Sequence, residues 1–317
     1  MKKLISITTP CFNEEDNVRD CYEAVKALFD GPLSNYAREH IFADNCSTDT
    51  TATILREIAA ADPDVRVIVN ARNFGPMRST YNAVLASSGD AILLFQPADM
   101  QDPPSLLPQF VALWEQGYEI VYGIRATRSE GFVMRSVRHT FYQLISRFSY
   151  VSFPPDVGDY QLVDRKVLDA MRKTEDAYPF MRMMTFESGF RAVGVPYHWL
   201  ARKKGFSKNS FFSLVDQGLN GIITFTTIPL RGALFVGTAV SILSIVYALV
   251  MLMTSLLATG HVAQPGIPTL IVALFFFAGI QIFFMGLLGE YILAIYGQVR
   301  KKPLVIERER INFPASE

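Results

Sequence analysis

Three short clusters of carboxylate and amide side chains hold the residues of this 317-residue chain that could do chemistry. Each cluster follows an apolar run typical of a β-strand. Carboxylate and amide oxygens are the ligands that Mg²⁺ accepts from proteins, and phosphate oxygens commonly complete its shell. The chain has neither a GxGxxG fingerprint nor a GxxxxGKS/T loop, which favours a cation that bridges to a diphosphate. The clusters are TTPCFNEED at 8–16, ADNCSTD at 43–49 and QPADMQDPP at 96–104.

Strand-like and helical patterns alternate over roughly the first 125 residues and would position these clusters. Repeated strand–helix units of this length predict an α/β fold, with a mostly parallel sheet flanked by helices. Ligands of such sheets bind beyond the carboxyl ends of the strands, where all three clusters fall. Ser47, Thr48 and Asp49 offer N-cap oxygens to the second helix. Strands are predicted at 4–9, 41–43, 65–69, 91–95 and 118–122. Helices are predicted at 17–29, from the residues after Asp49 through Ala61, at 77–87, and from Ser105 onward.

Two apolar runs, at 232–260 and 267–289, indicate that the chain passes from water into lipid. Between Gly232 and Gly289 there is no Asp, Glu, Lys or Arg. Each run reaches the roughly 20 residues that cross a bilayer, whereas buried helices of a soluble core are the alternative. Basic residues flank the pair but not its connector, so the catalytic domain and both termini are expected in the cytosol. Small residues such as Gly279 would let hairpins associate into a homo-oligomer.

The overall composition excludes some classes of protein. Lys and Arg together number 30, as do Asp and Glu, so no net positive charge points to nucleic acid. The three cysteines form no CxxC pair, which favours a reducing compartment over a disulfide framework.

Eight motifs, taken in order, resemble the family-2 glycosyltransferases with a GT-A fold. The match is closest to the polyprenyl-phosphate glycosyltransferases, which include dolichol-phosphate mannose synthase and bacterial undecaprenyl-phosphate glucosyl- and aminoarabinosyltransferases. The resemblance implies metal-dependent, inverting transfer of one sugar from a nucleotide diphosphate sugar, most often a UDP-sugar, to a polyprenyl phosphate. It also implies contact with membrane lipid at a bacterial inner membrane. The motifs are TTPCFNEE, DNCSTD, RNFG, PADMQDPP, GDYQLVDR, RKKGFSK, PLR and GLLGEYILAIYGQVR.

The resemblance also implies a role for individual residues. Asp99 and Gln101 would hold Mg²⁺ or Mn²⁺ on the diphosphate, and Asp159 matches a carboxylate proposed as catalytic base. Asp44 would bind the base or ribose. The nucleotide pocket would be shaped by Pro10, Phe12, Asn13, Glu14 and Asn73, and phosphates would meet Arg125, either Arg135 or Arg138, Arg202 and Lys208.

Two positions depart from the family pattern. Pro97 replaces the first aspartate of the usual DxD, and Asn45 replaces the second aspartate of the usual DDGS. Pro97 leaves open an alternative, a catalytically silent membrane scaffold that binds sugar nucleotide. Asp99 could instead cap the helix that follows Pro103, and Asp159 could be a turn residue. A processive polysaccharide synthase is disfavoured because the chain has no QxxRW motif.

These features divide the chain into four predicted parts. They are a cytosolic GT-A domain at 1–208, an interfacial amphipathic segment at 209–228, a two-span transmembrane hairpin at 229–297 and a basic cytosolic tail at 298–317. A helix of the soluble core is the alternative for the apolar part of the second segment, 211–228. The basic residues between Arg202 and Lys208 could equally bind lipid headgroups next to the hairpin.

Overall fold

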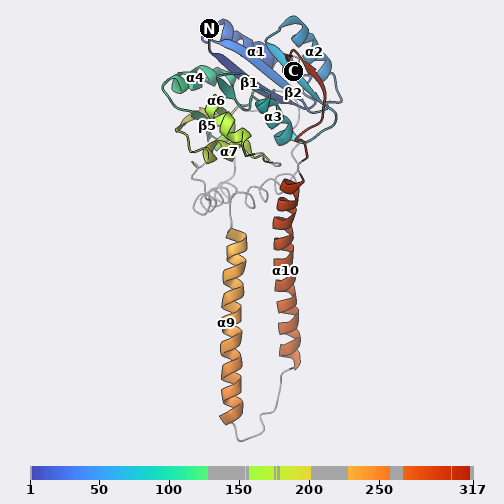
Figure 1. Cartoon of the computed structure of the whole chain (residues 1–317), viewed down its shortest axis with the longest axis vertical. Helices are drawn as coiled ribbons and strands as arrows, with labels where there is room; N and C mark the ends of the chain where they lie inside the picture. The colour runs from blue at the N-terminus through green and yellow to red at the C-terminus, as the bar shows by residue number, and fades with distance from the viewer. Residues whose placement is uncertain are drawn as a thin grey trace. The chain divides into compact units, whose positions relative to one another are not determined.

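The computed structural model describes residues 2–127, 154, 157–174, 176, 179–200, 228–257, 267–300 and 302–314. These residues form two compact units. The first contains the described residues up to Leu200 together with those from Arg300 onward, and the second contains the helices between them (Figure 1).

The first unit is built on one eight-stranded sheet, in the order β7-β5-β6-β4-β1-β2-β3-β8. Neighbouring strands β4, β1, β2 and β3 are parallel, whereas β6 and β8 run antiparallel to their neighbours. The predicted α/β fold with a mostly parallel sheet is thereby confirmed. The strands are β1 Leu4–Cys11, β2 Ala37–Asp44, β3 Val65–Asn70, β4 Ala91–Leu93, β5 Ile120–Thr127, β6 Val157–Asp164, β7 Ala192–His198 and β8 Glu307–Ile311.

Helices cover both faces of the sheet because side chains alternate between its faces along each strand. Phe42 and Val67 pack on one face against Leu55 of α2, whereas Ile41 and Ile68 pack on the other face with α3. The buried residues of α1 recur every three or four positions and form its core-facing stripe. The helices are α1 Val18–Asp30, α2 Thr51–Ala61, α3 Pro76–Leu85, η1 Pro104–Leu106, α4 Leu107–Glu115, α6 Arg165–Arg172 and α7 Met181–Glu187.

Strand β8 was not predicted. It comes from the predicted basic tail and pairs antiparallel with β3, placing Ile68 opposite Arg310. The backbone N–H of Ala71 also donates to the carbonyl of Ile306, at 2.8 Å. Its sequence, ERERI, is mostly charged, which suits an edge strand that faces water and must not pair further.

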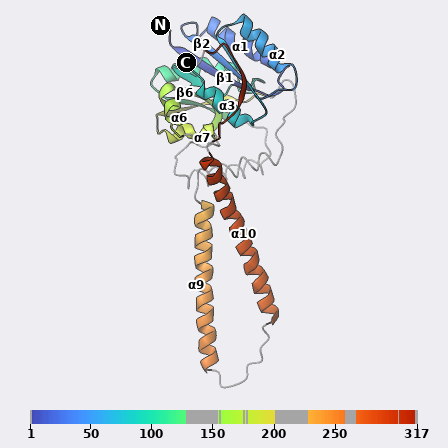
Figure 2. The same cartoon turned by 45° about the vertical axis from the view of Figure 1, so that its right-hand side comes forward.

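The second unit consists of two long helices, α9 Ile228–Leu257 and α10 Ile267–Val299 (Figure 2). Within the described residues, one segment, Phe276–Val299, is long and apolar enough to cross a membrane, and a shorter apolar helical stretch covers Gly232–Tyr247. Two predicted spans are therefore not shown. Phe235 and Phe283 are 71% and 67% exposed, as are many other apolar side chains of the two helices, so these helices present a large apolar surface.

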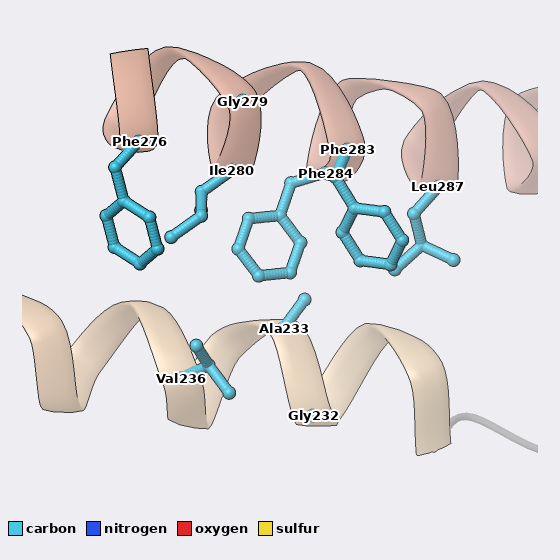
Figure 3. Close-up of a pocket in the computed structure, with 9 residues that line it drawn as sticks. All are labelled: Gly232, Ala233, Val236, Phe276, Gly279, Ile280, Phe283, Phe284 and Leu287. Carbon is cyan, nitrogen blue, oxygen red and sulfur yellow. The ribbon is translucent and has the colours of Figure 1, made fainter. Parts of the chain in front are cut away.

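An apolar cleft of about 690 Å³ lies between the two helices. Figure 3 shows Phe284 and Leu287 of α10 pointing toward α9, where Gly232 and Ala233 present almost no side chain. The small residues of α9 thus leave the space that the cleft occupies.

Candidate functional site

The three predicted clusters meet at one edge of the sheet, which we call the rim. Cys11 at the end of β1 lies beside Asp44 at the end of β2 in parallel register. The segment after β4 joins them, because the N–H of Gln96 donates to the carbonyl of Thr8 at 2.8 Å. Strand β6 runs the opposite way, so its first residues, including Asp159, begin at this same edge.

The loops after β1 and β2 are fastened to each other by side chains. The N–H of Asn13 donates to Ser47 Oγ at 2.9 Å, and the N–H of Thr48 donates to Asn13 Oδ1 at 2.8 Å. Asn13 adopts a left-handed φ of 54°, which asparagine tolerates better than most residues. Of the three oxygens expected to cap the second helix, those of Ser47 and Thr48 do not, because α2 begins later and both residues are used in the loop–loop contact. Asp49 Oδ1 does accept from the N–H of Thr51, the first residue of α2, at 3.0 Å.

The neighbouring positions of the first loop support it. Pro10 continues the pairing of β1, opposite Ala43, and Phe12 follows at the loop's start, partly buried. The N–H of Glu14 donates to Thr51 Oγ1 at 2.9 Å, and its carboxylate accepts from Asn17 Nδ2 at 2.7 Å. The loop that carries three of the predicted nucleotide-binding residues, Phe12, Asn13 and Glu14, is therefore tied to the first turn of α2.

Asp44 is buried at the rim with one carboxylate oxygen unused. Its Oδ2 accepts from the N–H of Ser47 at 3.1 Å. Its Oδ1 is buried and has no hydrogen-bond partner among the described residues. Burial raises the pKa of Asp44 above its ordinary value. An unsatisfied buried acceptor is costly, so a donor from a ligand would relieve it.

Asn45 ties the end of β2 to the loop after β3 through both ends of its amide. Its Nδ2 donates to Asn73 Oδ1 at 2.9 Å, while its Oδ1 accepts from Asn70 Nδ2 at 3.1 Å and from the N–H of Phe74 at 2.9 Å. Asn73 Oδ1 also accepts from the N–H of Gly75 at 2.8 Å. The departure from the DDGS pattern thus has a structural reason, because an aspartate at this position could not donate.

Asn45→Asp, although it restores the family's usual residue, is expected to lower the free energy of unfolding by about 1–3 kcal/mol. The new carboxylate would face Asn73 Oδ1, another acceptor, inside a site where Asn45 is only 4% exposed. Thermal and urea unfolding measure the loss. Asn45→Ala is the matched control that removes the hydrogen bonds without adding charge. An Asn45→Asp variant as stable as the unmodified chain would contradict the assigned hydrogen-bond direction.

Asp99 and Gln101 lie in a tight turn, residues 98–102, which we call the Asp99 turn. Asp99 Oδ1 accepts from the N–H of Gln101 at 3.3 Å, and Met100 between them has a left-handed φ of 55°. No side chain caps η1, so the alternative role of Asp99 as a helix cap is wrong. Among the described residues no three His, Cys, Asp or Glu side chains group as a metal site. A cation held here would need phosphate oxygens besides Asp99 and Gln101, as Mg²⁺ commonly does.

Arg125, predicted to meet a phosphate, is paired inside the protein. Its Nη2 donates to both oxygens of Asp102, at 3.2 and 3.0 Å, and its Nε donates to Tyr197 Oη at 3.1 Å. Tyr197 in turn donates to Asp102. Burial acts to lower the pKa of Arg125, but Asp102 and Tyr197 outweigh it, and the net pKa is raised. The charge of Arg125 is thus largely balanced by its neighbours.

Asp159 is held by an arginine that was not predicted. Arg182 of α7 donates from Nε to Asp159 Oδ1 at 3.1 Å and from Nη2 to Oδ2 at 2.6 Å. Each side chain is 18% exposed, so the pair is accessible from solvent. The two-pronged contact fixes the plane of the carboxylate. The two residues are 23 positions apart in the sequence, so no local pattern indicated this contact.

The remaining predicted phosphate ligands lie outside the described residues. They are Arg135, Arg138, Arg202 and Lys208. Leu200, just before Arg202, is described, and its N–H donates to the carbonyl of Gln101 at 3.0 Å. The chain therefore leaves the described part of the domain directly beside the Asp99 turn.

Comparisons with known proteins identify the family of the chain. The family described as Glycosyl transferase family 2 matches residues 6–172. The uncharacterized glycosyltransferase YkcC of Bacillus subtilis (strain 168) is 33% identical over 302 residues, which cover 95% of this chain and 92% of that protein. The SfII prophage-derived bactoprenol glucosyl transferase of Shigella flexneri is 31% identical over 303 residues, covering 95% and 96%.

A crystal structure of M. tuberculosis glucosyl-3-phosphoglycerate synthase is 18% identical, with a TM-score of 0.48 over 70% of this chain and 79% of that one. A likeness at this level bears on neither substrate nor mechanism. The family match and the relatives that are similar over 95% of this chain are sufficient to assign the family without it. This chain is a glycosyltransferase and belongs to glycosyl transferase family 2.

Proposed function

We propose that this glycosyltransferase moves a single sugar from a UDP-sugar to a polyprenyl phosphate at the cytosolic face of a bacterial membrane. The observation that carries the proposal is the rim, where Asp44, the Asp99 turn and Asp159 come together at the strand ends. Relatives named bactoprenol glucosyl transferases, similar over 95% of this chain, support the lipid acceptor.

The nucleotide is assigned to the β1–β2 side of the rim. The unused Asp44 Oδ1 there would accept a hydrogen bond from the base or a ribose hydroxyl. Asn13 and Asn73, each held by the loop contacts described above, would present a rigid surface beside it. Binding to a surface that is already ordered costs little conformational entropy.

The diphosphate is assigned to the Asp99 turn, where Asp99 and Gln101 would hold Mg²⁺ or Mn²⁺. Such a cation supplies charge neutralisation for the departing nucleotide diphosphate. The loss of an acidic residue at Pro97 is compatible with this role, because phosphate oxygens can fill the remaining positions of the cation's shell.

The acceptor is assigned to the side of Asp159. A phosphate monoester has a second pKa near 6, so it is largely dianionic at neutral pH and needs orientation more than deprotonation. Asp159, held in place by Arg182, would orient the acceptor or take its residual proton. A phosphate oxygen then bonds to the anomeric carbon as the bond to the diphosphate breaks. The product is therefore expected with inverted configuration.

A transfer assay distinguishes this enzyme from the silent scaffold that Pro97 leaves open. Full-length protein in detergent is given labelled UDP-sugars and undecaprenyl phosphate, with and without EDTA. We expect transfer that EDTA abolishes and Mn²⁺ or Mg²⁺ restores, and NMR of the product gives its anomeric configuration. Nucleotide binding without transfer of any common UDP- or GDP-sugar would favour the scaffold, and retained configuration would exclude a single displacement.

The sheet supports two membrane crossings over one. Strands β3 and β8 are paired in a single sheet, so they lie on the same side of any membrane. The number of crossings between them must then be even. If Phe276–Val299 crosses, a second segment must cross as well, and α9 is the other long helix among the described residues. We assign both spans to the predicted hairpin at 229–297. The residues at 209–227, which make up nearly all of the predicted interfacial segment, lie outside the described part of the chain.

Labelling of one introduced cysteine at a time tests this topology. Val262→Cys lies in the connector and Lys302→Cys follows α10. A membrane-impermeant maleimide is expected to label Val262→Cys only from outside the cell and Lys302→Cys only in inverted vesicles, with the unmodified chain as the background control. Labelling of both from the same side would exclude one of the two spans.

A further inference from the structure

Asp102 closes the Asp99 turn with its side chain turned inward. The carboxylate is 1% exposed and is fully engaged by Arg125 and Tyr197, so it is not available to a ligand. Burial, and then the adjacent Asp102, raise the pKa of Tyr197 well above its ordinary value, which keeps its hydroxyl a donor. These three residues, which we call the Asp102 triad, join the Asp99 turn to β5 and β7.

Backbone contacts fasten the turn at further points. Gln96 Nε2 donates to the carbonyl of Asp102 at 3.1 Å, and the N–H of Leu200 donates to the carbonyl of Gln101 at 3.0 Å. Tyr160, fully buried, packs against Tyr197 and donates to the carbonyl of Pro103 at 3.3 Å. Asp99 and Gln101 are the two side chains of the turn whose oxygens could bind a cation. The backbone that carries them is therefore anchored by the Asp102 triad.

With Pro97 in place of an aspartate, the turn has only Asp99 and Gln101 to offer a cation, so their placement matters more. We propose that Asp102, Arg125 and Tyr197 are positioning residues that hold the Asp99 turn in the geometry that binds a divalent cation together with a nucleoside diphosphate. This inference rests on the proposed function, and it gives Arg125 a role inside the protein instead of at the acceptor phosphate.

The chain contains a matched control of the same three residue types. Asp62 accepts from Tyr22 Oη at 2.9 Å and from Arg38, far from the rim, because Arg38 and Asp62 lie near the starts of β2 and β3. Asp62 and Arg38 are both buried. Tyr197→Phe and Tyr22→Phe thus each remove one hydroxyl from a buried Arg–Asp pair, one near the Asp99 turn and one at the opposite end of the strands.

The test measures Mn²⁺ affinity in the presence of UDP, read from the EPR signal of free Mn²⁺, on the full chain in detergent. Tyr197→Phe is expected to weaken Mn²⁺ binding about tenfold, within the range found when residues behind a metal ligand are changed. Tyr22→Phe is expected to leave the affinity unchanged although both variants lower the melting temperature. In transfer assays, Tyr197→Phe should recover most of its kcat at high Mn²⁺, a recovery that general loss of structure would not allow.

Each outcome has a distinct meaning. Equal Mn²⁺ affinity in Tyr197→Phe and the unmodified chain would overturn the inference alone, as would an equal loss in both tyrosine variants. Asp102→Asn, which leaves Arg125 without its partner charge, is a second and more severe variant that should weaken Mn²⁺ binding further. Failure of the unmodified protein to bind Mn²⁺ with UDP would overturn the proposed function and this inference together.

Discussion

Asp99→Asn is expected to lower kcat/KM for sugar transfer by about 10²–10³-fold, the range found when one preorganised electrostatic contact is lost from an active site. The amide keeps the size of the side chain and its contact with the N–H of Gln101. It removes the negative charge, and the Asp99 turn has no acidic side chain at Pro97 to replace it. Initial rates at a series of Mn²⁺ concentrations measure the effect, which should persist at saturating UDP-sugar.

Asp64→Asn is the control for this prediction. Asp64 is exposed in the turn before β3, at the opposite end of the strand from the rim, so its neutralisation should leave transfer unchanged. An Asp99→Asn enzyme that keeps more than about a tenth of the rate would show that the carboxylate does not hold the cation, since a single lost contact of this kind costs far more.

Asp159→Asn is expected to lower kcat by about 10²-fold or more, the usual contribution of a positioned acid or base. Arg182→Lys should cause a smaller loss of the same kind, because lysine keeps the charge but cannot make the two-pronged contact with both carboxylate oxygens. Both changes act on the acceptor side of the rim, so KM for the UDP-sugar should stay close to its original value. Single-turnover rates at saturating acceptor measure the chemical step.

The double variant shows whether the two residues work as one unit. If Arg182 acts by orienting Asp159, then Arg182→Lys should cost little more once Asp159→Asn is present. Losses that simply multiply would mean that Arg182 acts on the substrate independently. The melting temperatures of all three variants show whether a lower rate reflects lost stability or lost chemistry. The loss of stability should be small, because the Asp159–Arg182 pair is only partly buried.

The strands that could be predicted are those with local signals in the sequence. Strands β1 to β5 and their helices are marked by short apolar runs, turn residues and helical spacing, all visible within a few positions. Strand β8 has no such marks, since four of its five residues are charged and only its partner, β3, makes it a strand. Tertiary pairing outweighs local propensity at such an edge.

The site was predictable as a set of loops but not as a set of contacts. The rim follows from the rule that parallel strands end together, which brought Asp44 and Asp99 to one edge. The ion pairs of Arg125 and Arg182 depend on which strand lies beside which, and β6 and β7 were not predicted. Likewise the donor role of Asn45 depends on how Asn73 is oriented across a neighbouring loop.

The pairing of β8 with β3 also bears on how the molecule is made. Strand β8 is the last of the eight strands in chain order, and α9 and α10 must be synthesised before it. Until β8 is synthesised, β3 is left as an open edge, with backbone groups that can pair with another extended chain. A truncated product that stops before Glu307 keeps that edge open and is therefore expected to aggregate more readily than the chain that carries β8.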